Sequence, residues 1–369
     1  MILLSSIIKT FESAFLDQYQ GEILPSHRKA LAALQVCRTR HSPRMQAGCS
    51  ECDHQITLPH SCGHRNCPHC QHHESQQWLE RQLQKQVPAE YFLLTFTLPA
   101  ELRSLAWHHQ RQLYALMIQC VWETVRTFSQ NDKQLQGMPG AIAVLHTHTR
   151  RLDYHPHVHL VMPGAAMDAV NRLWRTKGGK NKKPYLFNHT ALAKVFRAKL
   201  LEAITHEGLV LPSKYPEEWV VDCKSVGTGE KALVYLGRYL YRGVIQEKNI
   251  VACQDGKVTF RYQNAKTKQW ELRTVTGAKF LWLVLQHVLP KGFRRARNFG
   301  FLHPNSKRLI HLLQLLVGLD PTRALALIKK RPVLLCPCCG AKMKIIETRL
   351  PPFFRFSTLE IMRPEGDRH

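Results

Sequence analysis

Apolar side chains recur along this chain with two different periods, and each change of period predicts where strands and helices lie. The dense β-branched and aromatic run Tyr91–Leu98 predicts a buried strand that ends at Pro99. Apolar positions between Leu113 and Phe128 then fall on one face of a helix. Strand-like runs return at Ala141–Leu145 and Pro156–Met162. Helices and strands therefore both contribute to the predicted core.

The same mixture continues towards the C-terminus. Residues 191–204 have a helical pattern, and Trp219–Cys223 has the pattern of a strand. A Gly-Thr-Gly break then precedes a predicted helix that carries Tyr235 and Tyr239. Two strand-like runs on either side of Asp255-Gly256 predict a hairpin.

The N-terminal part has a different texture. Residues 1–36 have amphipathic spacing, which predicts helices that form a packing arm. Residues 37–71 are rich in Cys and His but poor in periodic apolar positions, and such a segment needs a staple to be stable. Three segments are predicted: the helical arm with this Cys-rich module in 1–85, a main domain in 86–300, and a C-terminal helical tail in 301–369.

Charge adds a partner to this picture. Lys and Arg number 52 against 27 Asp and Glu, which leaves a formal charge of +25 with all 21 histidines neutral. Such an excess favours a polyanionic partner, because each cation set against a phosphate releases condensed counterions. No apolar run approaches the roughly 20 residues that span a bilayer, so no membrane partner is expected.

The twelve cysteines are interpreted as metal ligands rather than disulfides. The opening apolar stretch is too short for a signal peptide, so cytoplasmic residence is expected, and a reducing cytoplasm does not sustain disulfides. Cys49-x2-Cys52 and Cys67-x2-Cys70 are separated by fourteen residues, close to the spacing at which paired thiolates close a structural zinc site. Inert buried thiols are the alternative.

Other cysteines leave the number of zinc ions open. Cys37, Cys62, His64 and His69 lie in the same stretch and could complete a second site or replace a named ligand. Near the C-terminus, Cys336-Pro-Cys338-Cys339-Gly340 resembles half of a zinc ribbon, and the sequence offers no visible second half. A reduced, metal-free turn explains this knuckle equally well, because a complete site needs four ligands.

Two basic stretches lie in the main domain. Residues 175–183 contain five Lys and Arg side chains among glycines. This pattern indicates either a solvated loop or a loop that tracks the phosphates of a nucleic acid. The second basic stretch runs from Lys291 to Arg297.

The strand at Pro156–Met162 carries a histidine motif. Side chains two apart in a strand point to the same face, so His157 and His159 can both reach one cation while Val158 packs into the core. A His-x-His pattern alone is a weak signal, and two surface histidines are the alternative.

The predicted helix at residue 235 supplies two phenols. Tyr235 and Tyr239 are four residues apart and share a helix face, so both can be presented to one site. A phenol is a poor nucleophile at neutral pH, but a nearby cation lowers the free energy of its phenolate. The alternative is an amphipathic helix with tyrosine hydroxyls at the surface.

Taken together, these motifs resemble the transposase family typified by insertion sequence 91, the two-tyrosine HUH enzymes linked to rolling-circle transposition. The resemblance spans nearly the whole chain in the family's order. The matching stretches are Asn66–Gln71, Phe96–Pro99, His157–His159, Tyr235–Tyr239, Gly256–Arg261, Val288–Phe293 and Cys336–Gly340.

The resemblance implies an α+β fold: an HUH nuclease core with a central antiparallel sheet and flanking helices, preceded by a small zinc-binding module. It also implies a divalent cation, Mg or Mn, on His157 and His159, and Tyr235 or Tyr239 as the attacking group. The expected partner is single-stranded or melted DNA at element ends, cut through a 5′-phosphotyrosine without a nucleotide cofactor, in the nucleoid of a bacterial cytoplasm. A replication initiator or relaxase-like nickase, and a zinc-dependent DNA-binding protein without catalysis, are the alternatives.

Such sites usually have a third metal ligand. His146, His148, Asp153 and His155 are all near enough in sequence to supply it. His155 shares the strand face by period, but Pro156 disturbs that register. The third ligand, the first tyrosine to attack and the oligomeric state therefore stay open.

Overall fold

The structure is a computed structural model that forms two compact units. It describes residues 2–39, 41–168, 170–171, 173–177, 185–241, 243–316, 318–320 and 333–351. The larger unit combines residues 1–35 with 63–330, and the smaller unit combines residues 36–62 with 331–369. Each unit therefore draws on chain segments that are far apart in sequence.

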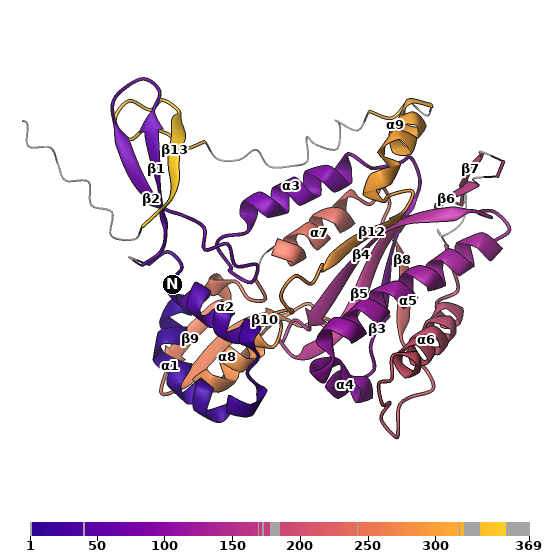
Figure 1. The fold of residues 1–369 in the computed structure, drawn as a ribbon, viewed down its shortest axis with the longest axis horizontal. Coiled ribbons are helices and arrows are strands. Elements are labelled where there is room, and N and C mark those ends of the chain that lie inside the picture. Colours follow the sequence, from indigo (N-terminus) through magenta and orange to yellow (C-terminus); the bar gives the residue numbers. More distant parts are fainter. Residues whose placement is uncertain are drawn as a thin grey trace, which may run out of the picture. The chain divides into compact units, whose positions relative to one another are not determined.

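The larger unit is built on an antiparallel sheet of seven strands (Figure 1). The strand order is β7-β6-β4-β5-β3-β8, and β12 also pairs with β4. The strands are β3 (Tyr91–Thr97), β4 (Met138–His148), β5 (Tyr154–Pro163), β6 (Ala165–Asp168), β7 (Leu173–Thr176), β8 (Val221–Ser225) and β12 (Ala296–Gly300). The strands predicted near residues 91, 141 and 156 therefore lie side by side as β3, β4 and β5, with β5 between the other two.

Two groups of helices cover the opposite faces of this sheet (Figure 1). Leu94, Leu145 and Val158 face a core formed with α4 (Arg103–His108), α5 (Gln110–Asn131) and α6 (His189–His206). Ile142 and Val144 face a second core formed with α3 (His72–Leu83), α7 (Glu230–Tyr241) and α9 (Lys307–Leu316). Successive side chains of a strand alternate between its faces, so β3, β4 and β5 each contribute side chains to both cores. The predicted α+β class, an antiparallel sheet with flanking helices, is confirmed.

A second sheet in the larger unit has three antiparallel strands. Asp255 and Gly256 both have positive φ, which suits the tight turn of the predicted hairpin between two of them. The elements are β9 (Ile250–Gln254), β10 (Lys257–Gln263), β11 (Trp270–Thr276), α8 (Gly277–Leu285), α1 (Leu4–Gln18) and α2 (Pro25–Val36). The predicted N-terminal arm thus forms helices, and α1 packs against α8 within the larger unit.

The smaller unit contains a three-stranded antiparallel sheet in the order β13-β1-β2. Its strands are β1 (Arg44–Cys49), β2 (Gln55–Pro59) and β13 (Met343–Leu350). The buried core of this unit is small: Ala47, Cys336 and Met343 with a few partly buried neighbours. The predicted helical tail over 301–369 is divided between the two units. Helix α9 lies in the larger unit, and the segment described after it forms the strand β13 in the smaller unit.

Short 3-10 turns complete the larger unit. They are η1 (Gln20–Glu22), η2 (Ala100–Leu102), η3 (Glu247–Asn249) and η4 (Pro304–Ser306). Within the described ranges, no helix combines the length and the apolar character that crossing a membrane requires.

A substitution at Gly300 tests how closely β12 must pack against β4. The φ of Gly300 is +56°, and an added Cβ would lie 1.7 Å from the carbonyl oxygen of Pro139. Gly300→Ala is expected to lower the free energy of unfolding by about 2–5 kcal/mol, from the left-handed backbone and the steric clash together. Urea unfolding followed by circular dichroism measures the loss.

Gly208→Ala is the matched control, because Gly208 also has a positive φ of 72° but has nothing within 4 Å of the added Cβ. It is expected to lose only the backbone contribution, about 1–2 kcal/mol. Equal losses in the two variants would contradict a steric role for Gly300.

Candidate functional site

Three imidazoles converge on the sheet face that α7 covers. His146 comes from β4, and His157 and His159 come from β5. Their candidate ligand nitrogens all lie within 4.8 Å of one another. The strand pairing explains this closeness, because His146 lies directly opposite His157 in the antiparallel register.

The predicted alternation along β5 is observed. Val158 is fully buried in the core with α5, whereas His157 and His159 are partly exposed on the opposite face. Leu145 of β4 is buried in the same core as Val158, which turns His146 towards the other two histidines. The core on one face therefore positions the histidines on the other.

Burial keeps these imidazoles neutral. It lowers the pKa of His157 to about 4 and that of His159 to about 3, and it lowers the pKa of His146 well below its usual value. Positive charge on neighbouring histidines adds to the effect at His146 and His159. Neutral imidazoles keep a lone pair, which is the form that binds a metal.

The hydrogen bonds leave the inner nitrogens available. His157 donates from Nδ1 to the carbonyl oxygen of His155 at 2.7 Å, and His159 Nδ1 lies 3.0 Å from Thr95 Oγ1. His146 Nε2 is buried and has no hydrogen-bond partner within the described chain. A buried polar atom without a partner is costly, and a metal would satisfy this one. The residues present therefore fit a divalent cation.

The geometry also selects among the four candidates for a third ligand. His146 completes the cluster. Asp153 instead pairs with Arg273 at 2.8 Å, His155 Nδ1 contacts Arg103 Nη2 at 2.7 Å, and His148 Nδ1 contacts Tyr239 Oη at 2.6 Å.

Helix α7 brings both predicted tyrosines to this cluster. The ring of Tyr239 lies flat on His146, with ring centroids 3.3 Å apart and an angle of 6° between the planes. The ring of Tyr235 is 6.1 Å from that of His159 and 6.3 Å from that of His146. The four-residue spacing thus places both phenols beside the same three imidazoles.

The two phenols differ in their exposure to solvent. Tyr235 is 47% exposed, whereas Tyr239 is covered and holds its hydroxyl against His148. Burial raises the pKa of both groups, and nearby cations oppose it: Arg150 at Tyr235 and Arg295 at Tyr239. Substrate entering from solvent meets Tyr235 first.

Arg295 is a site residue that the sequence did not single out. Its guanidinium lies 5.3 Å from the centre of the Tyr239 ring. It donates from Nε to the carbonyl oxygen of Leu145 in β4 at 3.2 Å and from Nη1 to that of Leu240 in α7 at 3.3 Å. Its only signal in the sequence was membership of the basic stretch 291–297.

His146, His157, Tyr235 and Tyr239 line a cavity of about 570 Å³. Its other wall comes from the second sheet, where Arg261 lies 5.1 Å from the ring of Trp270 and Trp270 is 59% exposed. A cation and an exposed aromatic ring are the groups that contact phosphates and bases of a single nucleic-acid strand.

The smaller unit contains a cluster of four cysteines: Cys49, Cys52, Cys336 and Cys339. Cys49 Sγ lies 3.4 Å from Cys339 Sγ, and Cys52 Sγ lies 3.7 Å from Cys336 Sγ and 3.6 Å from Cys339 Sγ. Disulfide sulfurs would be about 2.05 Å apart. With Zn–S bonds of about 2.3 Å, tetrahedral zinc holds its sulfurs about 3.8 Å apart, which these distances approach.

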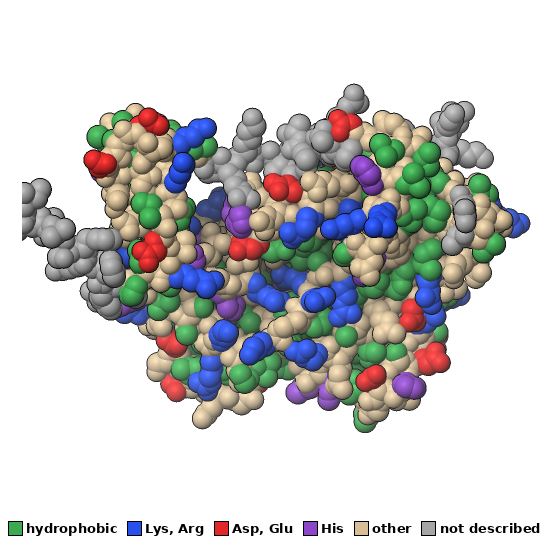
Figure 2. All heavy atoms as spheres, turned by 45° about the horizontal axis from the view of Figure 1, so that its top comes forward, with side chains coloured by type: hydrophobic (Ala, Val, Ile, Leu, Met, Phe, Trp, Pro, Cys, Tyr) green, Lys and Arg blue, Asp and Glu red, His purple; other side chains and the backbone are tan. Residues whose placement is uncertain are grey.

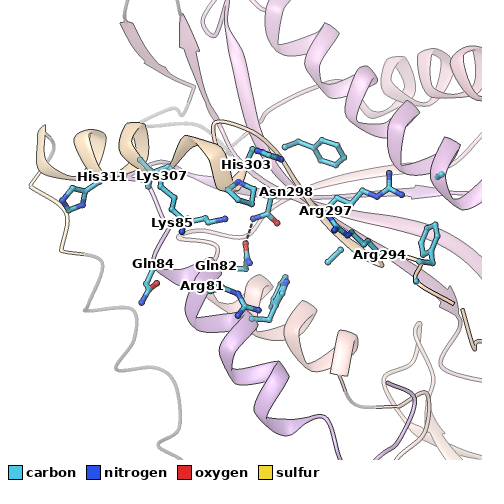
Figure 3. Close-up of a pocket in the computed structure, with 18 of the residues that line it drawn as sticks. Arg81, Gln82, Gln84, Lys85, Arg294, Arg297, Asn298, His303, Lys307 and His311 are labelled. Atoms are coloured by element: carbon cyan, nitrogen blue, oxygen red, sulfur yellow. Dashed lines mark hydrogen bonds between the residues drawn. The ribbon is translucent and has the colours of Figure 1, made fainter. Parts of the chain in front are cut away.

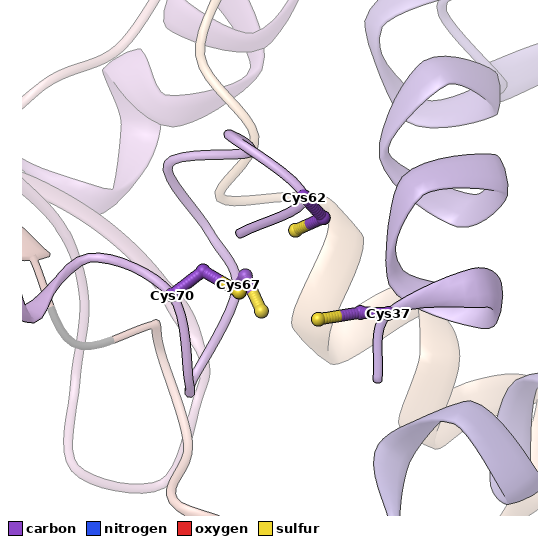
Figure 4. Close-up of side chains that lie close together, drawn as sticks. All are labelled: Cys37, Cys62, Cys67 and Cys70. Carbon is purple, nitrogen blue, oxygen red and sulfur yellow. The ribbon is translucent and has the colours of Figure 1, made fainter. Parts of the chain in front are cut away.

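A second cluster contains Cys37, Cys62, Cys67 and Cys70, whose Sγ atoms lie within 4.8 Å of one another (Figure 4). Cys37 follows α2, and Cys67 and Cys70 lie just before α3. Figure 4 shows the side chains of Cys37 and Cys62 directed towards that of Cys67. This set also has the composition of a closed structural zinc site.

The expected pairing of the two knuckles with each other is therefore corrected. Cys49 and Cys52 join the C-terminal cysteines, and Cys67 and Cys70 join Cys37 and Cys62. The reason is topological, since β13 pairs with β1 and brings the C-terminal knuckle to the first one. The C-terminal half ribbon thus has a second half, and Cys37 and Cys62 complete the other cluster.

The loop predicted to be solvated or to follow phosphates is partly described. Arg175 pairs with Asp168 at 3.1 Å, and Lys177 pairs with Asp132 at 2.5 Å, so the charges of these two residues are already compensated. Residues 178–184 lie outside the described residues.

Two family models match the chain. "Transposase zinc-binding domain" matches residues 7–98, and "Putative transposase" matches residues 140–309. The second range contains the three histidines and both tyrosines.

Two relatives are also named as transposases. "Putative transposase y4qJ" of Sinorhizobium fredii is 29% identical over 81% of this chain and 79% of its own length. "Transposase for insertion sequence element IS801" of Pseudomonas savastanoi pv. phaseolicola is 26% identical over 69% of this chain and 64% of its own length. The conjugative relaxase TrwC in complex with oriT DNA aligns over 62% of this chain and 72% of its own, with 14% identity and a TM-score of 0.25.

The chain is thus similar to transposases, with the zinc-binding range preceding the transposase range. The predicted resemblance to the transposase family typified by insertion sequence 91 is confirmed by these two models and by the two relatives.

The cysteine geometry predicts the zinc content. Because each of the two clusters has four thiols, we expect two zinc ions per chain. Cys336→Ser should lower the content by about one ion, as measured by inductively coupled plasma mass spectrometry, because zinc with three thiolates is held more weakly. Cys338→Ser is the matched control, since Cys338 is exposed and outside both clusters. A full zinc content in Cys336→Ser would remove Cys336 from the ligand set.

Proposed function

We propose that this transposase cleaves one DNA strand by attack of a tyrosine on a phosphodiester and transfers the strand through a 5′-phosphotyrosine, in rolling-circle-type transposition. The observation that carries the proposal is the convergence of Tyr235 and Tyr239 on His146, His157 and His159. The chemistry needs a nucleophile and a centre of positive charge beside the same phosphate.

His146, His157 and His159 would hold the divalent cation, Mg or Mn, and the unpartnered Nε2 of His146 supports this assignment. When bound, such a cation supplies positive charge that stabilises the developing charge on the phosphate and the phenolate of an attacking tyrosine. The two four-cysteine clusters have no open position for substrate and would hold structural zinc instead.

The reaction exchanges one phosphodiester for another. The phenolic oxygen forms a bond to phosphorus, the bond from phosphorus to the 3′-oxygen breaks, and that oxygen leaves as a 3′-hydroxyl after taking up a proton. The 5′ end stays joined to the tyrosine, and a 3′-hydroxyl can reverse the attack to join a new strand. No nucleotide cofactor is needed, because the number of phosphoester bonds is unchanged.

The two tyrosines take successive roles. Both tyrosines line the cavity, and Tyr235 makes the first cut because it is the more accessible of the two, with 47% of the residue exposed. Tyr239 acts second, because its ring is covered by His146 and its hydroxyl is bonded to His148. The cavity with Arg261 and Trp270 suits a single or locally melted strand, whose phosphates and bases are both accessible.

An adduct assay tests the nucleophile. With short single-stranded oligonucleotides of element ends and Mg or Mn, the wild-type protein is expected to form a covalent DNA adduct that survives denaturation. Tyr235→Phe should lower the rate of adduct formation by on the order of 10³-fold or more, and the Tyr235→Phe, Tyr239→Phe double variant should form none. Gel electrophoresis with mapped DNA ends measures both results.

Tyr241→Phe is the control for the tyrosine variants, because Tyr241 lies on the same helix and packs in its core. It should keep the adduct. An adduct in the double variant would show that neither tyrosine is the nucleophile. DNA binding without any adduct or metal requirement in the wild-type protein would support the non-catalytic alternative.

A metal-binding assay tests the third ligand. His146→Gln should weaken Mn²⁺ binding at least about tenfold, since one of three imidazole ligands is lost. His155→Gln should bind Mn²⁺ as the wild type does, because the His155 side chain is outside the group of candidate ligand atoms and its Nδ1 contacts Arg103 instead. Isothermal titration calorimetry distinguishes the two, and the reverse ranking would assign the third ligand to His155.

A further inference from the structure

A second cavity in the larger unit, of about 1240 Å³, shares no lining residue with the histidine and tyrosine cavity. Its walls come from α3, from β12 and the segment before it, from α9 and from the start of α5 (Figure 3). We call it the basic groove, after the cations that line it. These are Arg81, Lys85, Arg111, Arg294, Arg297 and Lys307.

Within the described residues, the Lys and Arg side chains that line the groove have no acidic residues among them. Its lining, as the structure describes it, contains these six cations and no Asp or Glu. The ion pairs of the described residues include none of the six. Figure 2 shows Lys and Arg side chains gathered across the middle of the face that it draws, with few acidic side chains among them.

The cations also act on one another. Burial lowers the pKa of Lys85, and the charges of Lys307 and Arg81 lower it further. Burial likewise lowers the pKa of Arg297, with Arg294 adding to the effect. A bound polyanion would relieve this repulsion. The basic stretch at Arg175 and Lys177 differs, because both of those charges are already paired.

The Trp and Phe rings of the groove are already packed. Trp78 is 6% and Phe293 3% exposed, and Phe299 stacks on Trp122 with ring centroids 5.0 Å apart. Rings in this state offer no face for base stacking. The groove therefore presents cations suited to phosphates and two exposed imidazoles, His303 and His311, but no open Trp or Phe face for bases.

The groove is connected to the tyrosines in two ways, through neighbouring residues in the chain and through side-chain packing. Arg294 and Arg297 lie on either side of Arg295, which covers the ring of Tyr239. Trp78 packs against the tyrosine helix so closely that an added Cβ on Gly237 would lie 3.3 Å from its ring.

We propose that the basic groove binds the sugar-phosphate backbone of the transposase's DNA, at a segment away from the cleaved phosphate, without reading its bases. The identity of this DNA as the strand that is cut rests on the proposed function. The groove then holds the flanking DNA by charge while the tyrosine cavity processes one phosphate.

Fluorescence anisotropy with a labelled single strand of roughly 40 nucleotides tests the groove. The full-length protein carries Tyr235→Phe and Tyr239→Phe, so that no strand is cut during the measurement. Arg294→Gln with Lys307→Gln is the groove variant, because both side chains are exposed and their loss should spare the fold. Lys133→Gln with Lys194→Gln is the matched control, which removes two exposed charges outside both cavities.

The groove variant is expected to bind about tenfold or more weakly at about 100 mM salt, on two probes of unrelated sequence alike. Its plot of log affinity against log salt should be shallower by about 1.4, or roughly 0.7 for each lost phosphate contact. Arg294→Lys with Lys307→Arg should restore binding. The control should bind within about twofold of the parent, since its charges face solvent away from the groove.

Binding by the groove variant equal to that of the control would overturn the proposal. A loss confined to one of the two sequences would also overturn it, because backbone contacts carry no sequence information. Formation of the covalent DNA adduct is measured in a separate assay, on the protein that keeps both tyrosines. Groove-dependent binding without an adduct would refute the cleavage proposal and support this one.

Discussion

The register between β4 and β5 is the constraint on which the rest of the site depends. His146 lies opposite His157, and Leu145 lies opposite Val158, in one antiparallel ladder. A slip of one residue would turn the histidines of β5 into the apolar core and place Val158 in the cavity. The free energy gained by burying Leu145 and Val158 against α5 therefore also maintains the histidine cluster.

A second constraint sets the tyrosine helix against these strands. Arg295 bonds to carbonyl oxygens of both β4 and α7, and Trp78 of α3 fits against the bare backbone at Gly237. Ser75 adds a hydrogen bond to the carbonyl oxygen of Gly237 at 3.1 Å. The position of the phenols is thus fixed by the hydrogen bonds of Arg295 on the strand side, and by packing and a hydrogen bond from α3 on the other side.

The features that the sequence predicts well are those governed by local periodicity. The strands at 91, 141 and 156, the long helix after the first of them and the hairpin at Asp255 all follow from spacing within a few residues. The shared faces of the histidine pair and of the tyrosine pair follow from the same spacing. β11 was missed, because Trp270 and Leu272 are largely exposed and its pattern lacks an apolar face.

Features that depend on distant segments could not be read from spacing. The closeness of Cys49 to Cys339 requires β13 to lie beside β1, and no local sequence pattern predicts that strand pairing. The third imidazole depends on which strand pairs with β5, and sequence proximity left four candidates equal. The covered state of Tyr239 against the exposed state of Tyr235 depends on His146 and His148 from another strand.

The cysteine cluster of the smaller unit has a consequence for synthesis on the ribosome. Cys52 and Cys336 are 284 residues apart, so the first knuckle is made long before its partners exist. At about 5–20 residues per second, the interval is roughly 14–57 seconds, during which two thiols stay without their final ligand set. A shortened copy of the protein that stops before Cys336 could never complete this cluster. The cysteine cluster and the pairing of β13 with β1 therefore form only after translation has passed this distant segment.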